Sequence, residues 1–180
     1  NAIIDIINGE DSSIYSCGYT HYKTMDEIPF PDYSGLGTYR ETTVISSRGC
    51  PNQCSFCASS FFWNRKWKTR QIENIIEEVK LRLQQGMTML VFDDDNFMNN
   101  RKRATEFCNV IIENKINIAW QATARAEALQ DEDLCRKLYE AGCYRVWLGI
   151  ESLSQDALDR CNKHTKVEAM LKGIETAERN

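Results

Sequence analysis

Three closely spaced cysteines are the residues best suited to chemistry in this sequence. Cys50, Cys54 and Cys57 are separated by three and two residues, in the run Arg-Gly-Cys-Pro-Asn-Gln-Cys-Ser-Phe-Cys. Thiolates are the usual ligands of iron–sulfur clusters. A cubane cluster has four irons, so one loop with three cysteines can bind three of them. The fourth iron is then left for a distant cysteine or for a small molecule.

Two other kinds of metal site are compatible with these cysteines. A structural zinc site needs four ligands and usually a second Cys-x-x-Cys or a pair of histidines. The chain has no second pair, and its two histidines, His21 and His164, are far apart in sequence. A closed cluster would need a fourth thiolate, for which the candidates are Cys17, Cys143 and Cys161. We favour an open cluster, in which a small molecule completes the fourth iron.

The cysteine loop also resembles a known family. Its spacing, with an aromatic residue at position 56, is similar to the cluster loop of the radical S-adenosylmethionine (radical SAM) enzymes. The longer string around the loop resembles the subgroup with an upstream cobalamin-binding domain, which includes the anaerobic oxidative cyclases of magnesium-protoporphyrin monomethyl ester. The resemblance runs from about Met25 to the end of the chain. It implies that Phe56 lies by the adenine of S-adenosylmethionine and that a 4Fe-4S cluster is held by Cys50, Cys54 and Cys57.

Hydrophobic periodicity predicts that this loop belongs to an α/β chain. Four apolar or β-prone runs are predicted strands: 42–47, 87–92, 116–123 and 144–150. Helical spacing follows each of the first three, over 72–83, 104–112 and 131–141. The continuously apolar run 87–92 is typical of a parallel strand buried on both faces. Two more helical pieces follow, and the last one opens with a predicted capping box at Thr165 and Glu168.

Four consecutive βα units predict a right-handed parallel sheet, either curved as in a barrel or open as in doubly wound folds. Radical SAM domains generally have six such units in a partial TIM-type barrel, so the resemblance implies that this chain holds about four of six. We expect residues 1–41 to be an irregular connector from a missing upstream domain. Residues 42–180 would be the N-terminal part of the radical SAM core domain. The open barrel edge could pair with a partner and so form an oligomer.

Polar residues follow the second, third and fourth predicted strands, where functional groups gather in parallel α/β folds. Residues 93–95 are three adjacent carboxylates, which repel one another unless a cation meets them. The alternative is a solvated turn that caps the next helix, for which Asn99 is equally suited. Arg125 could clamp a carboxylate with two hydrogen bonds or form a surface salt bridge. Glu151 and Ser152 could bind ribose hydroxyls, although Ser152 could instead cap a helix.

The resemblance implies that these positions bind the cofactor. The Phe-x-Asp-Asp-x-Phe string at 92–97 fits the cobalamin subgroup. It stands where many relatives have Gly-Gly-Glu, a motif that receives the methionyl ammonium group. By this resemblance three residues lie near S-adenosylmethionine: Asp94, Asp95 and Asn96. Arg125 would bind the methionyl carboxylate, and the run from Gly149 to Ser152 looks like the Gly-x-Glu-Ser ribose motif, which gives Glu151 and Ser152 that role.

Composition limits the partners that we expect. The chain has 180 residues, is 42% hydrophobic and carries a net charge of −4, which supports a globular core but no basic field for nucleic acid. No apolar stretch approaches the roughly 20 residues of a membrane helix, and no signal peptide opens the chain. We therefore expect a cytoplasmic protein without a membrane span, in which Cys108 and Cys135 act as small hydrophobic residues. The aromatic and basic run 61–70 could stack RNA bases, but a charged loop leading into the first helix is the simpler interpretation.

Together with the resemblance, these residues predict a radical SAM oxidoreductase or methyltransferase. Such an enzyme reductively cleaves S-adenosylmethionine to a deoxyadenosyl radical, which abstracts hydrogen from a small-molecule substrate. It needs an external electron donor, and cobalamin bound by a missing upstream domain would be a further cofactor. Two alternatives stay open, a non-catalytic iron–sulfur electron-transfer or sensor module and an RNA methylthiotransferase-like enzyme. The substrate is not predicted, because the later strands of such barrels usually shape its pocket.

Overall fold

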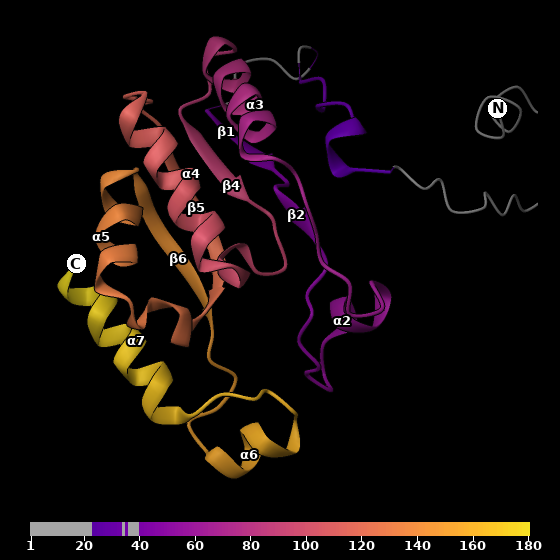
Figure 1. Ribbon diagram of the computed structural model, residues 1–180, viewed down its shortest axis with the longest axis vertical. Coiled ribbons are helices and arrows are strands. Elements are labelled where there is room, and N and C mark those ends of the chain that lie inside the picture. The colour runs from indigo at the N-terminus through magenta and orange to yellow at the C-terminus, as the bar shows by residue number, and fades with distance from the viewer. Residues whose placement is uncertain (1–22, 34, 36–39) are drawn as a thin grey trace, which may run out of the picture.

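The computed structural model describes residues 23–33, residue 35 and residues 40–180 (Figure 1). The predicted connector, residues 1–41, lies largely outside the described residues, so the division into connector and core domain stays a prediction. Its described part contains η1 (Met25–Glu27), a short 3-10 helix whose Met25 is buried. Within the described ranges, no helix combines the length and the apolar character that a membrane crossing requires.

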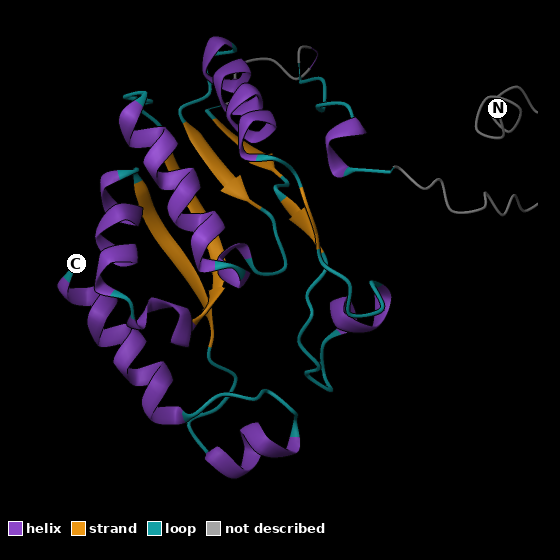
Figure 2. Cartoon of the chain, in the orientation of Figure 1, coloured by secondary structure: helices purple, strands orange, loops and turns teal. Residues whose placement is uncertain are grey.

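A four-stranded parallel sheet forms the centre of the fold (Figure 2). Its strands lie side by side in the order β1 (Glu41–Val44), β4 (Met89–Phe92), β5 (Ala119–Arg125) and β6 (Cys143–Gly149). In the register, Val44 pairs with Phe92 and Phe92 pairs with Ala122. The four predicted strands and their parallel pairing are confirmed. Neighbouring strands follow in chain order, so this sheet has no point at which the order reverses, unlike a doubly wound fold.

Helices α3 (Ile72–Gln84), α4 (Arg101–Glu113) and α5 (Glu132–Glu140) lie side by side over one face of the sheet, and α7 (Val167–Arg179) lies beside α5 (Figure 1). These are the helices expected from the spacing. Shorter helices connect the strands to them: η3 (Phe97–Asn99), η4 (Ala126–Gln130) and α6 (Gln155–Arg160). Asn100, one residue after the suggested Asn99, caps α4, and its side chain accepts a hydrogen bond from the amide of Arg103 at 3.0 Å.

The core lies between the sheet and these helices. Alternate strand residues face it, as the period of a β-strand requires, and they include Val44, Leu90, Phe92, Trp120 and Ala122. An aromatic cluster occupies its centre, with ring centroids 4.8 to 5.6 Å apart, and consists of Phe92, Phe97, Phe107 and Trp120. The predicted burial of Cys108 and Cys135 is confirmed. Burial raises the pKa of the Cys108 thiol to about 12, so this residue acts as a hydrophobic one.

The opposite face of the sheet is more open than the run 87–92 predicted. Met89 and Val91 are only half-buried. Gln121 is the register partner of Val91, and its side-chain oxygen accepts a hydrogen bond from Trp147 Nε1 at 3.0 Å. An unbroken apolar run therefore overstated the burial of this strand, because polar side chains of neighbouring strands share its second face.

A buried arginine–glutamate triad, Arg70, Glu78 and Arg82, lies beneath the described part of the connector. Glu78 Oε1 accepts a hydrogen bond from Arg82 at 2.7 Å, and the other carboxylate oxygen binds Arg70. Arg82 also donates to the Pro31 carbonyl oxygen at 2.9 Å, and its guanidinium lies 4.5 Å from the centre of the Tyr33 ring. The triad thus attaches residues that precede β1 to helix α3.

The predicted capping box at Thr165 and Glu168 is wrong. Helix α7 begins after Lys166, and Thr165 Oγ1 is buried without a hydrogen-bond partner among the described residues. The amide of Val167, at the start of α7, instead donates a hydrogen bond to the side chain of Gln155 in α6 (Oε1, 3.2 Å). A distant residue has therefore replaced the local cap, and the sequence pattern alone cannot reveal such an exchange.

Candidate metal centre and cofactor cavity

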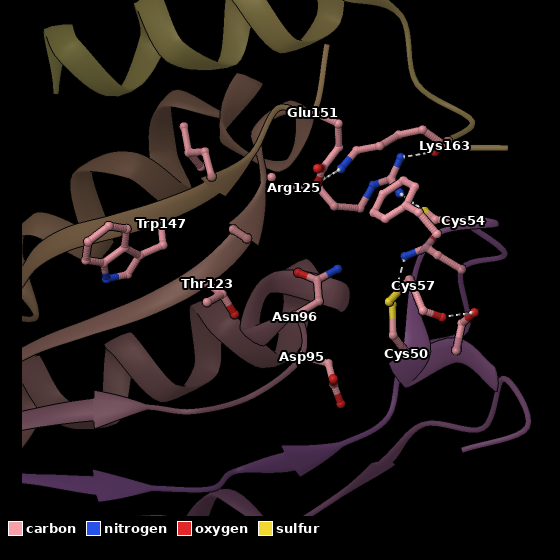
Figure 3. Close-up of a pocket in the computed structure, with 16 residues that line it drawn as sticks. Cys50, Cys54, Cys57, Asp95, Asn96, Thr123, Arg125, Trp147, Glu151 and Lys163 are labelled. Carbon is pink, nitrogen blue, oxygen red and sulfur yellow. Dashed lines mark hydrogen bonds and ion pairs between the residues drawn. The ribbon is translucent and has the colours of Figure 1, made fainter. Parts of the chain in front are cut away.

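A cavity of about 310 Å³ lies between the cysteine loop and the residues that follow β4, β5 and β6 (Figure 3). All three predicted ligands line it: Cys50, Cys54 and Cys57. Figure 3 shows Asn96, Thr123 and Trp147 on the opposite side, with Arg125, Glu151 and Lys163 closing one end. Motifs far apart in sequence meet here because the carboxyl ends of parallel strands share one edge of the sheet.

Two short elements hold the cysteine loop against the sheet. β2 (Ser47–Arg48) precedes the loop and pairs antiparallel with β3 (Lys68–Thr69). α2 (Ala58–Phe62) begins directly after Cys57. The run 61–70, predicted as a charged loop into the first long helix, therefore also contains the end of a short helix and a strand. Such two-residue pairing is too short to leave a recognisable period in the sequence.

The three cysteines differ in environment, although all are free thiols. Cys50 is 9% exposed, and its sulfur accepts a hydrogen bond from Asn52 Nδ2 at 3.1 Å. Cys54 and Cys57 are half-buried, and Cys54 Sγ lies 3.8 Å from Nη1 of Arg125. The sulfurs of Cys50 and Cys54 thus each have an N–H donor beside them.

The three cysteines do not converge on one point as the ligands of a single metal ion would. No three histidine, cysteine or acidic side chains converge as ligands of one ion in the described part of the chain. A structural zinc ion needs four converging ligands, whereas a cluster is bound by thiolates on separate irons. No fourth cysteine of the described ranges lines the cavity. Cys143 Sγ donates to the Arg145 carbonyl, Cys161 Sγ donates to the Leu158 carbonyl, and Cys17 lies outside the described residues.

The three adjacent carboxylates point in different directions. Asp93 and Asp95 are exposed, whereas Asp94 between them is 3% exposed, because successive side chains of an extended segment alternate in direction. Asp94 does not line the cavity. It accepts hydrogen bonds from the Ser46 amide at 2.7 Å and from the hydroxyls of Ser46 and Ser47 at 2.6 and 2.5 Å. Burial raises the pKa of Asp94, and these hydrogen bonds oppose that shift.

Asp95 and Asn96 do line the cavity. Asp95 Oδ2 accepts a hydrogen bond from the Gly49 amide at 2.8 Å, at the entry to the cysteine loop. Asn96 is buried, and its Oδ1 has no hydrogen-bond partner within the described residues. A buried amide oxygen without a partner calls for a donor, and the cavity is where a ligand could supply one. Of the three positions in this motif, Asn96 is therefore best placed to contact a cofactor.

Arg125 reaches the cavity from the end of β5, but most of its donors are occupied. Nε donates to Glu127, and Nη2 donates to the carbonyl oxygens of Lys163 and His164. The remaining nitrogen, Nη1, faces Cys54. To bind a ligand carboxylate with two hydrogen bonds, Arg125 would have to give up some of these partners. That role therefore stays a prediction.

Lys163 is a cavity residue for which the sequence offers no signal. It is 4% exposed, and its Nζ lies 3.1 Å from Glu151 Oε1 and 6.0 Å from the centre of the Phe56 ring. Glu151 has a φ of +61°, a left-handed conformation that is uncommon outside glycine. Lys163 follows Glu151 by twelve residues, with helix α6 between them, so no short motif joins the two. The structure thus adds a buried cation to the predicted set.

Of two further predicted cofactor residues, Phe56 and Ser152, only Phe56 lines the cavity. Phe56 lines the cavity and is 53% exposed. Ser152 does not line it, and its hydroxyl oxygen accepts a hydrogen bond from the Ser154 amide at 3.0 Å. Ser154, rather than Ser152, caps α6. The ribose role of Ser152 stays a prediction, without a contact to the cavity.

The chain matches the model of the Radical SAM superfamily over residues 44–180. It is 32% identical over 165 residues to an uncharacterized methyltransferase of Pyrococcus horikoshii. This match covers 87% of this chain and 36% of that protein. It is 31% identical over 136 residues to the anaerobic magnesium-protoporphyrin IX monomethyl ester cyclase of Rubrivivax gelatinosus, covering 74% of this chain and 24% of the cyclase. The relationship implied by the cysteine loop is thus confirmed.

Solved structures show a shared fold. The cobalamin-dependent S-adenosylmethionine radical enzyme OxsB, with aqua-cobalamin and S-adenosylmethionine bound, superposes with a TM-score of 0.67 at 20% identity. The match covers 75% of this chain and 22% of the OxsB chain. The matched part of the present chain therefore spans 22% to 36% of the length of these relatives.

Proposed function

This chain belongs to the radical SAM superfamily, and from that premise we propose that it forms the cofactor-binding part of a radical SAM enzyme. One observation carries the proposal: three free cysteines line one cavity, and no fourth cysteine of the described residues joins them there. Three thiolates leave one iron of a cubane cluster open to a small molecule. A non-catalytic electron-transfer module would need that iron closed.

The thiolates of Cys50, Cys54 and Cys57 would hold the 4Fe-4S cluster. When cluster and cofactor are both bound, they supply a one-electron cleavage of S-adenosylmethionine that yields a deoxyadenosyl radical for hydrogen abstraction. The residues of this chain contribute position and charge. N–H donors of Asn52 and Arg125 lie beside the sulfurs of Cys50 and Cys54, and a fixed loop geometry would hold the cluster against the cavity.

The opposite wall offers groups that complement S-adenosylmethionine. Asn96 Oδ1 is an unpaired buried acceptor suited to the methionyl ammonium, and the Lys163 ammonium supplies a positive charge for the carboxylate. Glu151 would accept from ribose hydroxyls, and the Phe56 ring would lie against the adenine. Arg125 would bind the carboxylate only after giving up one of its present acceptors.

The rest of the proposal concerns the whole protein. The strands follow one another in chain order with helices α3 to α5 over one face, which supports a partial barrel of about six units. The outer edge of β6 would then pair with a further strand or a partner. The cobalamin-dependent relatives support cobalamin as a further cofactor, bound upstream. A small-molecule substrate and an external electron donor complete the scheme, and the free thiols of the described residues suit a reducing cytoplasm.

Electron paramagnetic resonance tests the proposal. The chain is reconstituted anaerobically with iron and sulfide, reduced, and measured with and without S-adenosylmethionine. We expect a cubane signal whose g-values move when the cofactor is added. Cys54→Ala should abolish that signal, and the matched variant Cys161→Ala should retain it. A signal unmoved by the cofactor would argue against an open iron, and a chain that takes up zinc but no iron would refute the cluster.

A further inference from the structure

We propose that Asp94 and Asp95 are positioning residues that fix the entry of the cysteine loop to the end of β4. By this interpretation they set where Cys50 presents its thiolate, rather than binding S-adenosylmethionine themselves. Only the last step, that Cys50 binds iron, depends on the proposed function. We call the two residues the carboxylate clamp.

Asp94 holds the base of the loop. Both of its carboxylate oxygens are engaged, and all three of its hydrogen bonds come from Ser46 and Ser47. The two serines are 0% and 1% exposed, so each donor depends on Asp94 for a partner. Arg103 of α4 completes this group, since its Nη2 donates to the Ser46 carbonyl at 2.9 Å and its charge lies close to Asp94. The segment before the loop is thus held from two separate elements.

Asp95 holds the next part of the loop. Its hydrogen bond of 2.8 Å to the Gly49 amide acts one residue before the first predicted ligand. Gly49 also lies close to the Lys66 backbone, because a Cβ built at Gly49 would lie 2.1 Å from the Lys66 carbonyl oxygen. Gly49 is therefore in close contact with both a carboxylate and a backbone carbonyl, one residue before Cys50.

The clamp also connects the loop to the far wall of the cavity. Thr123 Oγ1, at the end of β5, donates to the backbone carbonyl of Asp94 at 2.6 Å. Asn96 follows the clamp directly and lines the cavity with Thr123 (Figure 3). The two clamp residues and Asn96, which lines the cavity, are therefore consecutive residues of one segment. Cys50 and Asn96 are fixed relative to each other through a few short hydrogen bonds.

A direct cofactor contact is the competing interpretation. It is weak for Asp94, whose carboxylate is buried, fully engaged and absent from the cavity lining. It is stronger for Asp95, which is exposed, lines the cavity and uses only Oδ2 in the hydrogen bond to Gly49. An experiment must therefore separate the position of Cys50 from affinity for S-adenosylmethionine.

Alkylation of the apo-protein makes this separation, because it needs neither cluster nor cofactor. The chain without metal is treated with iodoacetamide, and each cysteine is followed by peptide mass spectrometry. In Asp95→Ala we expect Cys50 to react about tenfold faster than in the wild type, the effect of losing one hydrogen bond to a charged group. Asp93→Ala is the matched control, since it removes the same charge from an exposed neighbour. Cys108 reports on unfolding and should stay protected in both variants.

Two more variants sharpen the result. Asp95→Asn keeps an oxygen that can accept from the Gly49 amide, and it should stay within about twofold of the wild type. Ser47→Ala removes one donor to Asp94 on the loop side and should also accelerate Cys50. An unchanged Cys50 rate in Asp95→Ala, or Asp95→Asn as reactive as Asp95→Ala, would overturn the clamp. General acceleration that includes Cys108 would overturn it too, since the effect would then be loss of the fold.

The loaded protein gives a second readout. In Asp95→Ala, an electron paramagnetic resonance signal that differs from wild type before S-adenosylmethionine is added supports the clamp. A wild-type signal without cofactor, combined with a weakened cofactor-induced shift, would assign Asp95 to the cofactor and overturn it. If the wild-type chain takes up no cluster, the proposed function fails, but the alkylation rates of the apo-protein still decide on the clamp.

Discussion

Replacing Gly49 with alanine tests how tightly the entry to the cysteine loop is built. Gly49 and Gly86 have nearly the same φ, +86° and +84°, both in the left-handed region. A Cβ at Gly49 would lie 2.1 Å from the Lys66 carbonyl oxygen and 3.0 Å from the Trp63 Cβ, whereas a Cβ at Gly86 meets nothing within 4 Å. Gly86→Ala is therefore a matched control, with the same backbone strain and no collision.

The expected loss of stability has two contributions, backbone strain and the collision of the new methyl group. A left-handed alanine costs about 1–2 kcal/mol, and this strain applies to both variants. Overpacking adds about 1–3 kcal/mol, and it applies only at Gly49, because the Lys66 carbonyl is backbone and cannot rotate away. We expect the free energy of unfolding to fall by about 2–5 kcal/mol in Gly49→Ala and by about 1–2 kcal/mol in Gly86→Ala. Each kcal/mol should lower the Tm by about 2–4 °C in a chain of this length.

Urea unfolding of both variants, followed by circular dichroism, measures this difference directly. The same variants are then reconstituted, and their cluster content is compared with that of the wild type. We expect Gly49→Ala to bind less cluster and Gly86→Ala to bind as much as the wild type, since Gly86 lies at the end of α3, away from the cavity lining. Equal losses of stability would refute the reasoning, because the loop would then have given way to the methyl group without cost.

Three further predictions concern buried charges and thiols. Glu78→Gln leaves the two arginines of the triad without their shared carboxylate and should cost about 3–5 kcal/mol in urea unfolding, whereas the exposed-site control Glu77→Gln should cost little. Burial raises the pKa of Cys108 from 9.0 to about 12, so at pH 9 its alkylation should be about five-hundredfold slower in the native protein than in urea, where half of the thiol is ionised; comparable rates would contradict its burial. The raised pKa of Asp94 means that the native state holds this proton more tightly than the unfolded chain, whose value is 3.8. The contribution of Asp94 to the free energy of unfolding should therefore fall as the pH rises above about 4. Urea unfolding from pH 4 to 7 measures this fall, and it should be absent in Asp94→Asn.

The parallel sheet and the cysteine loop were predictable because both are determined locally. Each strand is marked by a short apolar run and each helix by apolar residues at helical spacing. Leu90 and Ile75 can therefore be recognised as core residues from the residues around them. The three cysteines are equally local, since one loop must supply all of them. The likeness of the loop to radical SAM enzymes then identified the family, which the match over residues 44–180 confirms.

The residues that were missed depend on contacts between distant segments. Lys163 enters the cavity only because the chain returns to it after α6. The direction of Asp94 depends on where the extended segment after β4 begins to turn, and a shift of one residue would exchange the buried and exposed carboxylates. The repulsion expected among residues 93–95 is relieved in the same way, since alternate side chains point apart and Asp94 meets hydroxyls and Arg103.

The cysteine loop is anchored just before its first cysteine and again within it, and the second anchor explains why Lys163 lies where it does. Asp95 binds the Gly49 amide before the loop, and the Cys161 carbonyl accepts a hydrogen bond from the Ser55 amide within it at 2.9 Å. Cys161 was a candidate fourth ligand, but its backbone holds the loop while its sulfur bonds elsewhere. Two residues later the same segment delivers Lys163 to the cavity. Because one short segment both holds the loop and carries Lys163, ordering of the loop should also order the ammonium group of Lys163 at the cavity.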